Sequence, residues 1–143
     1  MTILFGTVYY RRRQFAKAVD EYNRAINIID THEKTFNSGS TKEKADAYCL
    51  RGTAESQIGN HNEAVRDFNK ALKIYKEIYG SHHNKPSALA FGNLGRVYLL
   101  FEDKDEADRC FDLALDILND IIGEKDQDYI RFKNIKEHVS EAQ

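Results

Sequence analysis

Small and apolar residues recur along this chain with the spacing of paired α-helices. In three segments an alanine, an aromatic residue, a second alanine and an aliphatic residue stand at i, i+4, i+7 and i+8, which is one face of a helix. A glycine stands twelve residues before each first alanine. The copies are Gly6, Ala18, Tyr22, Ala25 and Ile26; Gly52, Ala64, Phe68, Ala71 and Leu72; and Gly95, Ala107, Phe111, Ala114 and Leu115. Five coincident positions in three copies indicate an internal repeat.

The repeated residue types predict two antiparallel helices per unit. Glycine in the first helix and alanine in the second allow the helices to approach closely, and the aromatic side chain fills the space beside them. We therefore expect an all-α fold, a right-handed superhelix of about three helical hairpins and a C-terminal capping helix. Helices are predicted near residues 1–12, 15–34, 42–58, 61–79, 86–101, 104–122 and 127–141.

The two ends of the chain have compositions that differ from the segments between them. Thr2–Tyr10 has the composition of a strand, but the repeat phase predicts a helix. In the last segment Phe132, Ile135 and Val139 share one helical face, while Lys133, Lys136 and Glu137 lie elsewhere. A half-polar helix of this kind is typical of the cap that closes a stack of repeats.

The length of 143 residues fits one domain, with units at 1–36, 42–80 and 86–123 and the cap at 127–141. The net charge is -2, but residues 1–101 carry 15 basic and 10 acidic side chains, whereas residues 102–143 carry 6 and 13. Beyond the short run Arg11, Arg12 and Arg13, neither part shows the concentrated basic face of a nucleic-acid domain. No apolar run approaches the roughly 20 residues that span a bilayer. We expect a cytoplasmic protein without membrane insertion.

These spacings resemble the tetratricopeptide repeat over roughly residues 1–122. The clearest copy runs from Phe91 to Tyr98 and continues through Ala107, Phe111 and Ala114. Departures from the pattern are Thr2, Arg51 and Glu55. The periods of 46 and 43 residues exceed the standard one of about 34, and the long form is similar to the kinesin light chain and nephrocystin group. Gly80 and Gly123 are predicted to end equivalent helices.

The resemblance implies a non-enzymatic scaffold or adaptor that binds a peptide or partner segment in a concave groove lined by its first helices. Helical phase places Gly92 on the groove side, together with nine candidate binding residues: Asn93, Arg96, Leu89, Leu100, Leu50, Thr53, Gln57, Thr7 and Tyr10. In the long-form group an asparagine at the place of Asn93 holds the ligand backbone, and a guanidinium such as that of Arg96 can hold a carboxylate. The alternative is that these are ordinary half-exposed helix residues.

Another branch of the family binds chaperone carboxyl termini through lysines, an arginine and asparagines. The five positions concerned are Ile3, Thr7, Leu50, Leu89 and Asn93, and none of them carries the residue that the clamp requires. We therefore expect no chaperone-tail clamp. Two other functions remain open: a regulatory peptide-sensing module acting on an effector, and an RNA-binding helical repeat, which a salt titration of RNA binding would test.

Other features lack the spacing that chemistry requires. Cys49 and Cys110 are not part of a nucleophile motif, and the histidines His61, His82 and His83 fall in predicted turns without metal-ligand spacing. We expect no catalytic residue, metal or cofactor. Five aspartates form one stripe on the helix at 104–122, interpreted as a solvated face or as an acidic ridge for basic segments: Asp105, Asp108, Asp112, Asp116 and Asp120.

Overall fold

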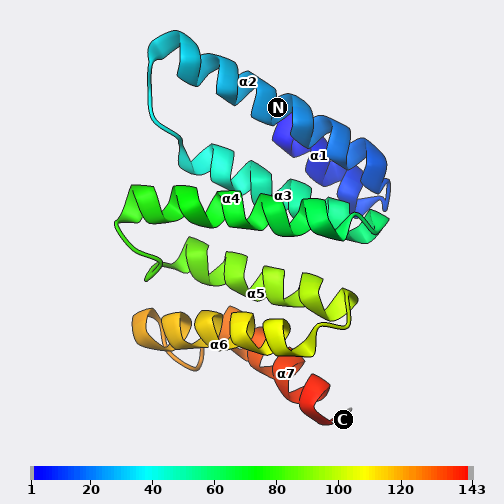
Figure 1. Cartoon of the computed structure of the whole chain (residues 1–143), viewed down its shortest axis with the longest axis vertical. Coiled ribbons are helices and arrows are strands. Elements are labelled where there is room, and N and C mark those ends of the chain that lie inside the picture. The colour runs from blue at the N-terminus through cyan, green and yellow to red at the C-terminus, as the bar shows by residue number, and fades with distance from the viewer. Residues whose placement is uncertain (1, 142–143) are drawn as a thin grey trace. The chain divides into compact units, whose positions relative to one another are not determined.

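Residues 2–141 are described by a computed structural model, and every regular element among them is an α-helix (Figure 1). The predicted all-α fold is confirmed, including a helix where composition alone suggested an N-terminal strand. The seven helices of the described residues are α1 Thr2–Arg11, α2 Phe15–Phe36, α3 Lys42–Ile58, α4 His61–Tyr79, α5 Lys85–Leu100, α6 Lys104–Ile121 and α7 Gln127–Glu141.

The chain divides into two compact units, Met1–Ile74 and Tyr75–Gln143, with the boundary inside α4. The first unit holds α1, α2, α3 and most of α4. The second holds the end of α4 together with α5, α6 and α7. The expectation of a single domain stays a prediction.

Local sequence signals explain where the helices begin and end. The side chains of Thr41, Asn84 and Asp103 accept hydrogen bonds from backbone N–H groups in the first turns of α3, α5 and α6. Gly80 and Gly123 follow α4 and α6 with φ values of 81° and 113°. These left-handed conformations favour glycine because it lacks a Cβ atom. The two predicted helix stops are therefore confirmed.

The core of the first unit forms around Tyr22, whose ring is 1% exposed. It packs with Ala18 and Val19 of α2 and with Ala54 of α3. A Cβ atom at Gly6 would lie 2.5 Å from the Tyr22 ring, so only glycine lets α1 approach α2 this closely. The repeated glycine thus serves the close packing that the sequence predicted.

The core of the second unit joins α5, α6 and α7 around two buried phenylalanines. Phe111 and Phe132 are both 0% exposed, and their ring centroids are 6.2 Å apart. A Cβ atom at Gly95 would lie 3.0 Å from the Phe111 ring, and one at Gly92 would lie 2.2 Å from the Phe132 ring. The buried Phe132 and the exposed polar side chains beside it confirm that α7 is a half-polar helix.

Candidate functional site

The α5 candidates divide between solvent and core. Arg96 and Leu100 are exposed, and Asn93 is half-buried. Leu89 is half-buried and packs against the core of the second unit. The expectation that Gly92 lies on the open groove side is wrong, because Phe132 of α7 covers it. The space open to a ligand on α5 therefore centres on Asn93, Arg96 and Leu100.

Arg96 differs from the other arginines that lie within helices α2 to α7. Within the part of the chain that the structure describes, neither Arg96 nor Asn93 makes a side-chain hydrogen bond or an ion pair. The other five arginines of helices α2 to α7 each pair with a carboxylate: Arg24, Arg51, Arg66, Arg109 and Arg131. Arg96 thus presents a guanidinium that no described carboxylate neutralises.

In the first unit, Tyr10 of α1 and Leu50 of α3 pack against the same core cluster. The hydroxyl of Thr7 donates to the carbonyl of Ile3 at 3.0 Å and lies 3.2 Å from the Tyr22 hydroxyl.

The two polar candidates of α3 differ. The Thr53 hydroxyl donates to the carbonyl of Cys49, four residues earlier, at 2.9 Å. Gln57 is exposed, and among the described residues its amide makes no hydrogen bond. A ligand on α3 would therefore meet a free amide only at Gln57.

A buried polar cluster in the first unit was not predicted from the sequence. The Arg51 guanidinium donates to both carboxylate oxygens of Asp67, at 2.9 and 2.7 Å, and to the Asn23 amide oxygen at 2.9 Å. Hydrogen bonding to Asp67 raises the pKa of Arg51 despite its burial. The available signal was that Arg51 departs from the repeat, while Asp67 occupies the place of Cys110 in the next unit.

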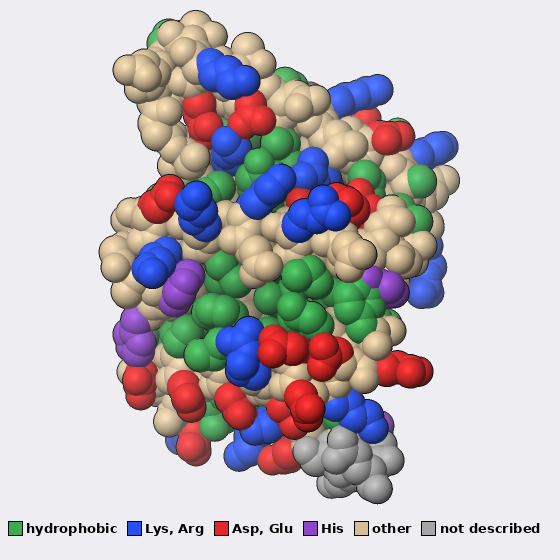
Figure 2. Space-filling view, in the orientation of Figure 1, with side chains coloured by type: hydrophobic (Ala, Val, Ile, Leu, Met, Phe, Trp, Pro, Cys, Tyr) green, Lys and Arg blue, Asp and Glu red, His purple; other side chains and the backbone are tan. Residues whose placement is uncertain are grey.

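The aspartate stripe of α6 is partly met by basic side chains of the same unit. Figure 2 shows a row of acidic side chains low on this face of the molecule. Lys136 of α7 pairs with Asp112, and this contact raises the pKa of the lysine. The His83 ring nitrogen lies 3.9 Å from Asp120. Both interpretations of the stripe remain, with α7 as one basic segment that contacts it.

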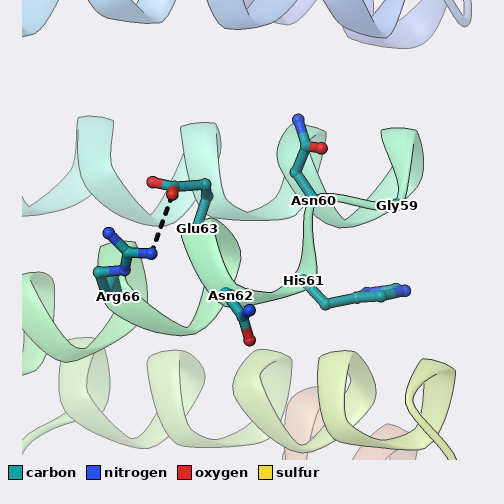
Figure 3. Close-up of a pocket in the computed structure, with 6 residues that line it drawn as sticks. All are labelled: Gly59, Asn60, His61, Asn62, Glu63 and Arg66. Carbon is teal, nitrogen blue, oxygen red and sulfur yellow. Dashed lines mark ion pairs between the residues drawn. The ribbon is translucent and has the colours of Figure 1, made fainter.

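A surface pocket lies where α3 joins α4 (Figure 3). It is lined by Gly59, Asn60, His61, Asn62, Glu63 and Arg66. Glu63 and Arg66 pair with each other at 3.0 Å, whereas Asn60, His61 and Asn62 point in different directions. Because the side chains do not converge, the pocket lacks the arrangement that acid–base or nucleophilic catalysis requires.

Two residues with reactive side chains, Cys110 and His82, lie in structural positions. Cys110 is 0% exposed, and burial raises the pKa of its thiol to about 11, so the nucleophilic thiolate is disfavoured. The His82 ring packs edge-on against Phe91, with centroids 5.4 Å apart, and burial together with Lys76 lowers its pKa. No three His, Cys, Asp or Glu side chains of the described residues are grouped to hold a metal ion.

Helical hairpins held together by repeated glycine, alanine and aromatic residues define a helical-repeat protein. A family model of the tetratricopeptide repeat matches residues 43–120, more than half of the chain, so the protein belongs to this family. Repeats of this family commonly mediate protein–protein interaction. No curated protein matches the chain significantly. Among the described helices none is both long and apolar enough to span a bilayer. The likeness to the kinesin light chain group stays a prediction.

Proposed function

We propose that this protein is a non-enzymatic scaffold or adaptor that binds an extended peptide or partner segment along the outward faces of its first helices. The observation that carries the proposal is Arg96, an exposed arginine without a carboxylate partner among the described residues. The protein's membership of the tetratricopeptide-repeat family supports the interaction role. The location we propose is cytoplasmic, where cysteines that lack a paired-motif spacing, such as Cys49 and Cys110, stay reduced.

The α5 side chains supply complementary chemistry for a peptide. The amide of Asn93 can donate to a backbone carbonyl and accept from a backbone N–H of an extended chain. The guanidinium of Arg96 can bind a carboxylate with two parallel hydrogen bonds. Leu100, which is 54% exposed, offers an apolar surface one turn further along. In the first unit, Gln57 of α3 offers a free amide, and Tyr10 and Leu50 beside the core cluster offer apolar surface.

The proposal can be tested with a peptide selected from a random displayed library against the full chain. Asn93→Ala and Arg96→Ala should each weaken binding by about 1–3 kcal/mol, because a polar group of the bound peptide loses its partner. Calorimetry gives the affinity, and circular dichroism should show an unchanged helical spectrum.

Arg109→Ala is the matched control, because Arg109 is also an exposed arginine of the second unit but is paired with Glu106 on α6. Its affinity for the selected peptide should equal that of the wild type. Unchanged affinity in the double variant Asn93→Ala, Arg96→Ala with the fold intact would remove the site from α5.

A further inference from the structure

One side of α1 exposes large apolar side chains. Leu4, Phe5 and Val8 are 62%, 48% and 38% exposed. Leu4 and Val8 are one turn apart with Phe5 beside them, so the three form one continuous patch. Arg11, the last residue of α1, and Arg12, which follows it, continue the same stripe and are exposed. These five residues are called the α1 surface below.

Two positions of the third repeat that are equivalent to this face are buried. Counted from the repeat glycine, Phe5 and Val8 of α1 correspond to Leu94 and Val97 of α5. Leu94 and Val97 are each 3% exposed, whereas Phe5 and Val8 lie open to solvent. The same positions are therefore buried in the third repeat and uncovered in the first.

For α3, the structure shows which residues cover this face. The corresponding positions are Arg51 and Ala54. Arg51 donates to Asn23 of α2 at 2.9 Å, and Ala54, which is 0% exposed, packs in one cluster with Val19 of α2. The surface that packs on this face of a first helix is thus the side of another helix.

Charge indicates which kind of helix would fit. Residues 1–19 contain four basic residues and no acidic one. Where α2 packs on α3, Lys44 of α3 pairs with Asp30 at 2.5 Å and with Glu33 at 3.0 Å, both on α2. Basic side chains on the first helix are there met by acidic ones on the helix that covers it.

We propose that the α1 surface docks an amphipathic α-helix of a partner protein, whose apolar stripe covers Leu4, Phe5 and Val8 and whose acidic residues meet Arg11 and Arg12. An antiparallel orientation places the first turn of the partner helix beside the two arginines. Acidic side chains in that turn also interact favourably with the helix dipole of the partner. The α1 surface shares no residue with the peptide-binding face proposed on α5.

Two fluorescent helical peptides of roughly 20 residues test the proposal. Both carry the same alanine, leucine and tyrosine face; one has aspartate and glutamate in its first turn, and the other has lysine there. Fluorescence anisotropy with the full chain should show binding of the acidic peptide, at least about tenfold tighter than that of the lysine peptide. Added salt should reduce the difference because exposed charges are screened.

Substitutions on the protein locate the contact. Leu4→Ser should weaken binding of the acidic peptide about tenfold, as expected for an apolar anchor. Arg12→Glu, which alters no core contact, should weaken it several-fold. Ile28→Ser is the control, because Ile28 is 60% exposed on α2 and lies outside the α1 surface. Arg96→Ala should also leave this affinity unchanged, which separates the result from the fate of the α5 site.

Several outcomes would overturn the proposal. One is no binding of the acidic peptide, or equal binding of both peptides. Another is unchanged affinity in Leu4→Ser and Arg12→Glu while circular dichroism shows intact helices. Cosedimentation with phosphatidylserine vesicles, abolished by Arg12→Glu, would assign the surface to lipid. Self-association in sedimentation equilibrium, lost in Leu4→Ser, would assign it to a second copy of the chain.

Discussion

The second and third hairpins place different chemistry at the same two repeat positions. In the second hairpin, Arg51 of α3 forms a two-pronged ion pair with Asp67 of α4. In the third, the residues 43 positions later are Leu94 of α5 and Cys110 of α6. Asp67 is 3% exposed, Leu94 3% and Cys110 0%, so these three side chains are buried. Arg51, which is half-buried, also reaches Asn23 of α2.

This comparison shows that the repeat requires a matched pair at these positions rather than a particular residue type. Desolvating a carboxylate and a guanidinium costs free energy, which their mutual hydrogen bonds offset. Two apolar side chains of suitable volume avoid that cost. Exchanging only one member of the pair would destabilise the fold, because it leaves one buried polar group without its partner.

The largest effect is expected when the ion pair is broken from one side. Arg51→Leu should lower the free energy of unfolding by about 3–5 kcal/mol, because Asp67 stays buried without its cation. Thermal and urea denaturation followed by circular dichroism measure the loss. The double variant Arg51→Leu, Asp67→Cys reproduces the third hairpin and should recover most of the stability. If the double variant were as unstable as the single one, the two hairpins would not be interchangeable at these positions.

A second, smaller loss of stability is expected when the repeat glycine is replaced, and it should be similar in both hairpins. A Cβ atom would lie 3.1 Å from the Phe68 ring at Gly52 and 3.0 Å from the Phe111 ring at Gly95. Gly95→Leu should therefore cost about 1–3 kcal/mol or more, because a branched side chain forces the helices apart. Gly52→Leu should cost a similar amount despite the polar pair nearby. Melting temperatures that stay at the wild-type value would argue against close helix contact at these glycines.

The smallest effect concerns pH and distinguishes the loops that precede the two hairpins. His82 packs on Phe91 before the third hairpin, and Gly39 takes its place before the second. Burial and Lys76 lower the pKa of His82, so its neutral form is favoured in the folded state. Its contribution to stability is therefore present above the ordinary histidine pKa of about 6.5 and is lost as pH falls through the lower folded-state value.

Urea unfolding at about pH 7.5 and pH 5.5 should show a decrease on acidification that is reduced in His82→Gln. The neighbouring His83, which lies near Asp120, serves as the control through His83→Gln. An identical pH dependence in wild type and His82→Gln would exclude His82 as the cause.

The sequence by itself determined the repeat, the helices and most of their ends. Helical periodicity and capping depend on residues within a few positions of one another, so Gly80 and Gly123 could be identified as helix stops from the chain alone. The first helices and their candidate residues, including Arg96, followed from the same local phase. That Arg96 has no described carboxylate partner became visible only in the structure.

Only the tertiary structure decided which side chains meet across helices. Arg51 departs from the repeat in sequence, but its partners Asp67 and Asn23 lie 16 and 28 residues away. Helical phase predicts that Gly92 lies on the open groove side, yet Phe132, 40 residues later, covers it. Helical phase fixes the side of its own helix on which a residue lies. The packing of the complete set of helices determines which neighbouring helix that side contacts, and no local pattern contains that information.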